Sequence, residues 1–341
     1  MNSLLSICIP TYNRADILCD ALEHLIPLAS RWGIAIYVSD NASTDDTGSV
    51  VAQARARYPN VFLHRNVQNI GMDGNFEVAL RLARTEYAWL LGDDDRIHHN
   101  ALEVVLKRLV EAPCDLLLLN GGSADHEQGR VTGQHLSVYD DPSVLLHDLG
   151  WHITWISGLV VSTRLVATMD FKKYIGTYFS HFGSLFDALA QQTVVNVQWY
   201  NGSCYFPSAF AKFTWAPRVL EIFAEKWSQV VLSLPERYSL AIKEECIRAH
   251  SRYTQLFSIM GFLNLRAQGA ITRSKIKHYR ESLLLATDIN PQLALLIASL
   301  PVWMLRTLRY IYIELRSLNS MRKMALSNQS QVAKKLGNVI K

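Results

Sequence analysis

Three consecutive aspartates stand directly after an apolar run in the segment "YAWLLGDDDRI", residues 87–97. Adjacent carboxylates repel one another unless a positive charge lies among them. Mg²⁺ and Mn²⁺ prefer oxygen ligands, and Mg²⁺ typically takes one or two carboxylates together with substrate phosphates. Asp93, Asp94 and Asp95 therefore predict a divalent cation site. The alternative is a solvated turn that caps a helix starting near His99.

Polar residues also follow earlier apolar runs of the chain. The runs begin at residues 3, 34, 61 and 87, and segments with helical spacing of apolar residues separate them. This alternation predicts an α/β fold with a mostly parallel sheet and helices on both faces, in which ligands bind at the carboxyl ends of the strands. Four strand ends should therefore form one polar crevice. Its predicted residues are Thr11, Tyr12, Asn13, Arg14, Asp40, Asn41, Asn66, Asn69 and Asp93 to Asp95.

Glycine motifs for phosphate binding are absent from the start of the chain. A dinucleotide-binding fold needs GxGxxG after its first strand, and a P-loop needs GxxxxGK[ST]. The first glycine is Gly33, which excludes both sites and also the glycine-rich loop of a sugar nucleotidyltransferase. A phosphorylated ligand would then be neutralised by the cation at the aspartates.

Four segments resemble the nucleotide-sugar half of family 2 glycosyltransferases, which have the GT-A fold. They are "SICIPTYNRADIL", "VSDNASTDDT", "NIGMDGN" and "WLLGDDD", within about the first 110 residues. A later segment, "YIGTYFSHFG", is similar to one in the bacterial O-antigen group that includes abequosyltransferase-like enzymes. The resemblance implies a metal-dependent, inverting hexosyl- or deoxyhexosyltransferase. It would move a sugar from a nucleoside diphosphate sugar to a bacterial surface glycan carried on a polyprenyl diphosphate.

The resemblance also implies roles for matching positions. Gly92 stands where the family's LD-x-DD form has its first aspartate, so the metal pair is either Asp93 with Asp95 or Asp94 with Asp95. Asp95 is the expected metal ligand, with Asp93 nearer the sugar, and Asp45 is expected to cap a helix. Asp40 would accept a hydrogen bond from the base, and a simple turn is its alternative. The remaining residues implied to bind the nucleotide sugar are Pro10, Thr11, Asn13, Arg14, Asn69, Gly71, Asn75, Asp93 and Asp94.

An inverting transfer needs a general base for the acceptor hydroxyl. The sequence offers no acidic pair between residues 151 and 215. His181 and Asp187 are the predicted candidates, and Asp170, a substrate-assisted route or a retaining route are the alternatives. The stereochemical outcome stays open. Tryptophans that could stack on acceptor sugars are Trp151, Trp155 and Trp199.

The chain divides into a predicted GT-A domain, residues 1–215, and a helical region, residues 216–341. Residues 1–120 would form the nucleotide-sugar half and residues 121–215 the acceptor half. The apolar segment 293–305 is too short to cross a bilayer. From Val302 onward eight basic residues against one acidic residue give +7, beside a predicted amphipathic helix. This favours attachment to an anionic membrane face; the alternative is a helical hairpin packed on the catalytic domain, with a solvated tail.

The overall composition excludes other classes of protein. A net charge of +4 and a charged fraction of 19% do not indicate a nucleic-acid binder. Five widely spaced cysteines without a CxxC pair fit a reducing compartment, and the N-terminal segment lacks the features of a signal peptide. We therefore expect a cytoplasmic protein, peripheral on the inner face of the cytoplasmic membrane. The alternative function is a non-catalytic carbohydrate-binding or scaffolding member of a glycan assembly complex.

Overall fold

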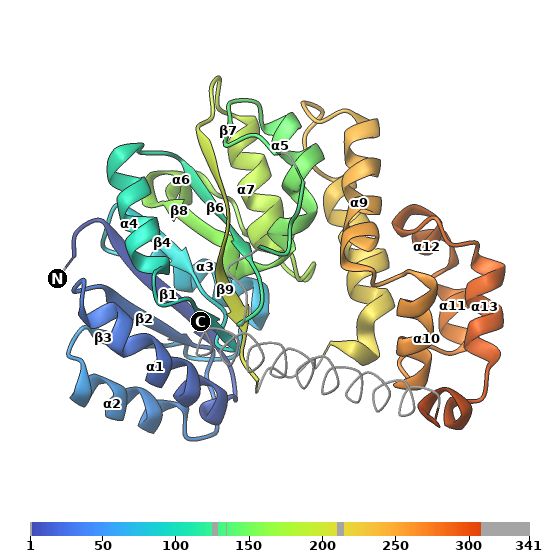
Figure 1. Cartoon of the computed structure of the whole chain (residues 1–341), viewed down its shortest axis with the longest axis horizontal. Helices are drawn as coiled ribbons and strands as arrows, with labels where there is room; N and C mark the ends of the chain where they lie inside the picture. The colour runs from blue at the N-terminus through green and yellow to red at the C-terminus, as the bar shows by residue number, and fades with distance from the viewer. Residues whose placement is uncertain (1, 125–128, 134, 210–214, 308–341) are drawn as a thin grey trace, which may run out of the picture.

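The computed structural model describes residues 2–124, 129–133, 135–209 and 215–307. It contains a mixed sheet with helices on both faces and further helices on one side of the molecule (Figure 1). Four strands pair in parallel in the order β3-β2-β1-β4 and coincide with the four apolar runs. They are β1 (Leu5–Thr11), β2 (Ala35–Asp40), β3 (Val61–Arg65) and β4 (Tyr87–Leu90).

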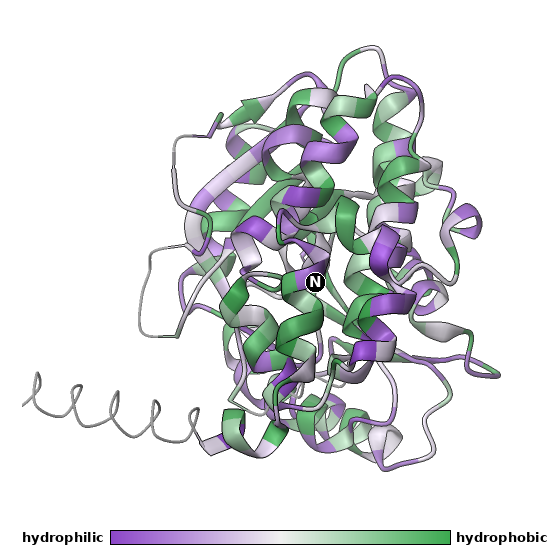
Figure 2. Ribbon diagram, turned by 90° about the vertical axis from the view of Figure 1, so that its right-hand side faces the viewer, coloured by the Kyte–Doolittle hydropathy of each residue, from purple (hydrophilic) through white to green (hydrophobic). Residues whose placement is uncertain are grey.

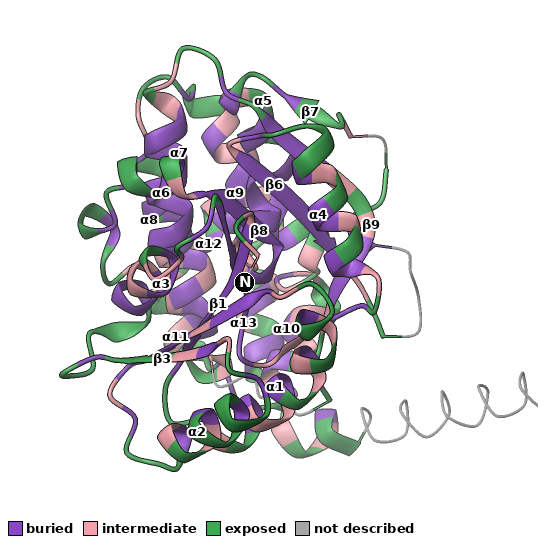
Figure 3. Cartoon of the chain, turned by 90° about the vertical axis from the view of Figure 1, so that its left-hand side faces the viewer, coloured by how far each residue is buried: buried purple, intermediate pink, exposed green. Residues whose placement is uncertain are grey.

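Helices follow each of these strands, and the side chains of β1 show how the two faces are filled. Leu5, Ile7 and Ile9 belong to one hydrophobic core and Cys8 to a second one, because successive side chains of a strand point to opposite faces. Strand β1 is therefore buried on both faces (Figure 3), whereas the edge strand β3 is exposed from Leu63 to Arg65. The helices of this half are α1 (Ala15–Ser30), α2 (Thr47–Arg57), α3 (Gly71–Arg81) and α4 (Ala101–Glu111).

Beyond β4 the sheet becomes mixed, in the order β4-β8-β6-β9-β5. β8 runs antiparallel to both neighbours, β9 lies parallel to β6, and β7 pairs with β9. The short β5 begins at Asp95 and pairs with β9, so the acidic triplet lies where the chain crosses between distant strands. These strands are β5 (Asp95–Ile97), β6 (Leu116–Gly121), β7 (Val138–Tyr139), β8 (Leu159–Ser162) and β9 (Val197–Pro207).

The aromatic segment that starts at Trp151 forms turns before the chain enters β8. Two 3-10 turns, η1 (Gly150–Thr154) and η2 (Ile156–Gly158), precede β8. Buried His152 explains the turn, because its ring hydrogen-bonds to the carbonyl oxygen of Leu119 at 2.9 Å and thereby holds η1 against β6. The chain between β6 and β9 also contains α5 (Pro142–Leu149), α6 (Thr163–Thr168), η3 (Lys172–Tyr174) and α7 (Ser180–Ala190).

The chain from residue 216 to residue 307 is helical, as predicted. Aromatic contacts join it to the sheet domain: the rings of Phe182 and Trp227 lie 4.7 Å apart, and Trp151 stacks on Tyr253 at 4.5 Å. One hydrophobic core therefore extends into these helices, and the division at residue 215 stays a prediction. The elements are η4 (Ala216–Arg218), η5 (Glu221–Lys226), α8 (Trp227–Leu232), α9 (Leu240–Thr254), α10 (Ile259–Ala267), α11 (Arg273–His278), α12 (Arg280–Ala286) and α13 (Pro291–Ser299).

In the part of the chain that the structure describes, no single helix has the length and apolar composition needed to cross a membrane. Helices α12 and α13 reach that threshold only as a pair, and they are bent by 117°. The predicted amphipathic helix and most of the basic tail, residues 308–341, lie outside the described residues.

Candidate functional site

The acidic triplet contacts the end of β1 directly. The hydroxyl of Thr11 donates a 2.7 Å hydrogen bond to Asp93 Oδ2, and Arg14 donates through Nη1 to Asp93 Oδ1 at 2.6 Å. The other arm of the same guanidinium donates to Asp94 Oδ2 at 2.7 Å. The carboxyl ends of β1 and β4 therefore meet, as the sequence predicts for neighbouring parallel strands.

Arg14 supplies positive charge among the aspartates. Burial raises the pKa of Asp93 to about 6, and the Arg14 charge opposes that rise. Burial also raises the pKa of Asp95 to about 7, although Ser157 donates a hydrogen bond to it. A cation bound at this loop would stabilise the ionised form of these buried carboxylates.

The donor set of the loop fits a divalent cation held by Asp94 and Asp95. A Cβ atom added to Gly92 would lie 3.2 Å from Asp95 Oδ2 and 3.3 Å from Asp94 Oδ1, so both carboxylates face the same space. Both oxygens of Asp93, by contrast, are engaged by Thr11 and Arg14. No three His, Cys, Asp or Glu side chains among the described residues could hold a metal by themselves. Further ligands would have to come from a phosphate or water.

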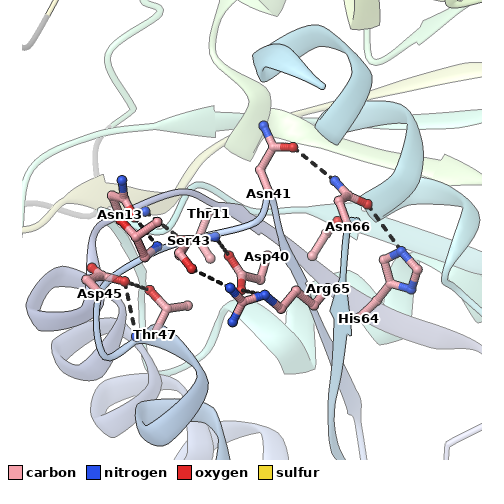
Figure 4. Close-up of polar contacts among 12 residues, drawn as sticks. Thr11, Asn13, Asp40, Asn41, Ser43, Asp45, Thr47, His64, Arg65 and Asn66 are labelled. Carbon is pink, nitrogen blue, oxygen red and sulfur yellow. Dashed lines mark hydrogen bonds and ion pairs between the residues drawn. The ribbon is translucent and has the colours of Figure 1, made fainter. Parts of the chain in front are cut away.

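Asp40 is a fully buried carboxylate at the end of β2. Its Oδ1 accepts a 2.8 Å hydrogen bond from the backbone of Ser43 (Figure 4). Its Oδ2 accepts no hydrogen bond among the described residues, and Arg65 Nε lies 3.7 Å away. Because buried polar atoms are normally hydrogen-bonded, Oδ2 is an acceptor suited to an N–H group of a bound base.

The loops around Asp40 are held by buried amide side chains. Asn75 accepts from the hydroxyl of Ser39 at 2.7 Å and from Asn66 at 3.1 Å, and it donates to the Ser39 carbonyl at 3.0 Å. Asn75, which the sequence assigned to nucleotide binding, is therefore buried and ties β2 to the loop after β3. Its amide also reaches the carbonyl of Thr11 at 3.4 Å.

Asn41 organises the segment that contains Asn69 and Gly71. Its Nδ2 donates to Asn69 Oδ1 at 2.9 Å and to the Gly71 carbonyl at 3.1 Å. Its Oδ1 accepts a hydrogen bond from Asn66 (Figure 4). Gly71 has φ +79°, a left-handed conformation that favours glycine. Asn69 and Gly71 are both exposed at the edge of the crevice.

The β1–α1 and β2–α2 loops are also joined. Asn13 lies in the left-handed region with φ 51°, and its Oδ1 accepts from the backbone of Thr44 at 2.7 Å. Asp45 accepts from the backbone of Thr47 at 3.1 Å and from that of Ala15 at 2.9 Å, so it supports the first turns of both α2 and α1 (Figure 4). Pro10 is buried within β1.

Asp73 has a positioning role that the sequence reasoning missed. This buried carboxylate accepts three backbone hydrogen bonds, each 2.9 Å long, from Gly176, Tyr178 and Ser180. It thereby orders the segment "YIGTYFS", in which Gly176 and Tyr178 have positive φ values. The sequence signal that could have indicated this role is the position of Asp73 within the segment "NIGMDGN".

The two predicted general bases lie in the interior. His181 is 1% exposed, its Nε2 donates to the carbonyl of Ile153 at 3.0 Å, and burial lowers its pKa to about 4. Asp187 is buried and pairs with Lys173 at 2.7 Å. Neither side chain forms a hydrogen bond to the acidic triplet among the described residues. Both candidate bases therefore have partners outside the acidic triplet, Ile153 for His181 and Lys173 for Asp187.

Turn η2 contacts the acidic loop through Ser157. The hydroxyl of Ser157 donates to Asp95 and accepts from the backbone of Gly92 at 2.9 Å. The neighbouring ring of Trp155 is partly exposed, and the guanidinium of Arg130 lies 4.6 Å above it. Trp151 and Trp199 are buried instead. Sequence reasoning missed Ser157 and Arg130, which no local motif marks.

Comparisons with known proteins relate this chain to glycosyltransferases. Residues 6–173 match the family described as glycosyl transferase family 2. Abequosyltransferase RfbV of Salmonella typhimurium is 30% identical over 198 residues, 52% of this chain and 59% of that protein. A Campylobacter jejuni protein named GalNAc(5)-diNAcBac-PP-undecaprenol beta-1,3-glucosyltransferase is 33% identical over 112 residues, 31% of this chain and 35% of that protein. The chain therefore spans less than two thirds of these relatives.

A solved structure shows the same architecture over most of the chain. Mannosyltransferase PcManGT from Pyrobaculum calidifontis, in complex with GDP-Man and Mn²⁺, superposes with a TM-score of 0.51. The superposition covers 92% of this chain and 88% of that one, at 14% identity. Residues 6–173 thus form a glycosyl transferase family 2 domain, and the chain has the GT-A fold.

Proposed function

We propose that this protein transfers a sugar from a nucleoside diphosphate sugar to a bacterial surface glycan of the O-antigen, capsule or lipopolysaccharide type. The observation that carries the proposal is the loop of Asp93, Asp94 and Asp95, held against the end of β1 by Thr11 and Arg14. This loop stands beside Asp40, the buried acceptor at the end of β2. The family match and the abequosyltransferase relative support the assignment.

The donor nucleotide is proposed to bind across the ends of β1 and β2. Asp40 Oδ2 would accept a hydrogen bond from the base, and the exposed ring of Tyr12 and the backbone around Asn13 would face the nucleoside. Asn69 and Gly71 would border the same pocket, whereas Asn75 acts by holding its walls. The GDP-Man complex of PcManGT supports a donor of this class.

A divalent cation, Mg²⁺ or Mn²⁺, is proposed to bind Asp95 and Asp94. When bound, it would neutralise charge on the departing diphosphate. Asp93 would stay with Thr11 and Arg14 and position the loop, facing the donor sugar side of the site. The positions of Asp94 Oδ1 and Asp95 Oδ2, which both lie around Gly92, support this choice over the pair of Asp93 with Asp95.

An inverting route is proposed, with His181 as general base. Its Nδ1 is a buried acceptor without a donor among the described residues, and its Nε2 bond to Ile153 connects it to the segment that leads to Trp155. Because the ring is 1% exposed, acceptor binding must uncover it for proton transfer. Asp187 is the second candidate, and its ion pair with Lys173 would have to open.

The acceptor is proposed to be carried on a polyprenyl diphosphate at the inner face of the cytoplasmic membrane. The undecaprenol-linked name of the Campylobacter jejuni relative supports this. No charged residue occurs from residue 289 to residue 305, a stretch in which Leu296 is 62% and Trp303 73% exposed. Arg273 hydrogen-bonds to Ser299 at 3.1 Å, so a cation lies beside this apolar helix. Figure 2 looks onto these C-terminal helices and shows their hydrophobic stretches.

The test is a thermal-shift panel of UDP, CDP, GDP and dTDP, each with Mn²⁺ or with EDTA. A ligand that binds only the native state raises the melting temperature, so one nucleotide should stabilise the protein in a metal-dependent way. Asp95→Asn should lose the metal-dependent part, and Asp46→Asn is the control because Asp46 makes no side-chain cap bond. A wild-type protein that responds to none of the nucleotides would contradict the proposal and favour a non-catalytic carbohydrate-binding role.

A further inference from the structure

Arg130 has an exposed side chain on a rigidly placed backbone. Its N–H donates to the carbonyl of Gly121 at 2.6 Å. Buried Asn120 holds the next residue twice, donating to Val131 O at 2.9 Å and accepting from Val131 N at 3.1 Å. On the other side, a Cβ on Gly129 would clash with the Asn120 side chain, so that residue is packed without spare room. The position of Arg130 is therefore determined by the end of β6.

The guanidinium of Arg130 lies beside the acidic loop and has no carboxylate partner among the described residues. It stands 4.6 Å from the ring centre of Trp155, whose neighbouring turn is bonded to Asp95 through Ser157. Gly121, whose carbonyl accepts from the backbone of Arg130, pairs with Tyr205 of β9, and β9 also pairs with β5, which begins at Asp95. Arg14 is paired with carboxylates in the same region, whereas Arg130 is not.

This arrangement is suited to an anion. A guanidinium stacked on an aromatic face keeps the N–H groups along its edge free for hydrogen bonds. Those N–H groups match the oxygen geometry of a phosphate and can bind it in a bidentate manner. The Trp155 ring thus orients the guanidinium while leaving its donors unused.

We propose that Arg130, oriented by Trp155, binds a diphosphate group at the acceptor side of the crevice. The inference rests on the proposed function, which brings two such groups to the site: the diphosphate of the sugar donor and that of the lipid-linked acceptor. Arg130 would complement the cation at Asp94 and Asp95 from the opposite side of the loop. It is a binding residue at a position that no sequence motif marks.

The matched control is Arg108. Its guanidinium also lies 4.6 Å from an aromatic ring, that of Tyr200, but it extends from α4. Full-length wild type, Arg130→Gln and Arg108→Gln are titrated calorimetrically in Mn²⁺ with three probes. The probes are inorganic pyrophosphate, the nucleoside diphosphate selected by the thermal-shift panel, and farnesyl diphosphate.

Arg130→Gln should weaken at least one diphosphate roughly tenfold or more, while Arg108→Gln binds like wild type. Weaker nucleotide binding assigns the donor diphosphate, and weaker farnesyl diphosphate binding alone assigns the acceptor diphosphate. Equal affinities of Arg130→Gln and wild type for all three probes would overturn the inference and leave the proposed function standing. A wild-type protein that binds no nucleotide would overturn both. Melting temperatures of the variants confirm that each is folded.

Discussion

Asp73 and Ser180 join the start of α3 to the start of α7 through two hydrogen bonds. Ser180 N donates to Asp73 Oδ1 at 2.9 Å, and Ser180 Oγ donates to the Asp73 carbonyl oxygen at 3.1 Å. Asp73 lies in the first turn of α3 and Ser180 begins α7. The start of α3 and the start of α7 are thus held together by one buried carboxylate.

Asp73→Ala should lower the free energy of unfolding by about 3 kcal/mol, because buried backbone N–H groups lose their acceptor. Hydrogen exchange of residues 176–180 should rise with it. Asp170→Ala is the control, since exposed Asp170 accepts a single local bond from Lys172 N at 3.1 Å. It should cost less than about 1 kcal/mol in a urea titration. Unchanged exchange in Asp73→Ala would contradict the assigned role.

Asp95→Ala should abolish glycosyl transfer and Mn²⁺ binding in the presence of nucleotide, because the loop loses one of its two proposed metal ligands. Asp45→Ala should mainly destabilise the protein, by about 1 kcal/mol, through the lost support of the α1 and α2 starts. Turnover and calorimetric metal titration measure both effects. Wild-type activity in Asp95→Ala would refute the metal assignment.

Arg14→Gln should increase the affinity of the nucleotide-free protein for Mn²⁺. The substitution removes the guanidinium that pairs with Asp93 and Asp94, so a metal no longer competes with it. The same change should lower the melting temperature in EDTA, since the buried Asp93 loses its counter-charge. Arg96→Gln provides a comparison, because Arg96 pairs with Asp20 instead. Metal affinity equal to that of wild type would show that Arg14 and the cation do not compete.

Acidification should destabilise the fold through buried histidines. Burial lowers the pKa of His250 to about 3 and that of His152 to about 4, below the ordinary value of 6.5. Between the folded and unfolded pKa values the unfolded chain binds more protons. The stability that these two histidines contribute by staying neutral is therefore complete above pH 6.5 and falls as the pH drops toward 4. Urea unfolding at pH 7.5 and pH 5 measures the loss. His250→Phe, which keeps the aromatic stack on Phe223, should reduce the slope.

His181→Gln should lower kcat about 100-fold or more if His181 is the general base. A glutamine amide can still donate to Ile153 O, so much of the packing should be kept. Asp187→Asn, which breaks the pair with Lys173, should change kcat by less than about tenfold, since a general base contributes more than that. The reverse ranking would move the base to Asp187. The anomeric configuration of the product, read by NMR, tests inversion separately.

The parallel half of the sheet and its helices were predictable because their signals are local. Leu18, Leu22 and Leu25 repeat with helical spacing and lie in the buried face of α1. Strand ends carry polar residues, and neighbouring parallel strands bring those ends together, as Thr11 and Asp93 show. The 3-10 turns before β8 were not predictable, because they depend on His152 reaching β6.

The sequence by itself determined the GT-A type of fold, the crevice at the strand ends and the acidic loop, since periodicity and motifs lie within short segments. Tertiary structure decided what each polar side chain does. Asn75 and His181 became buried contacts, while Arg130 came to lie over the ring of Trp155, next to the turn that Ser157 bonds to Asp95. Residue type cannot reveal this, because a side chain's partner and exposure are set by whichever segments pack against it.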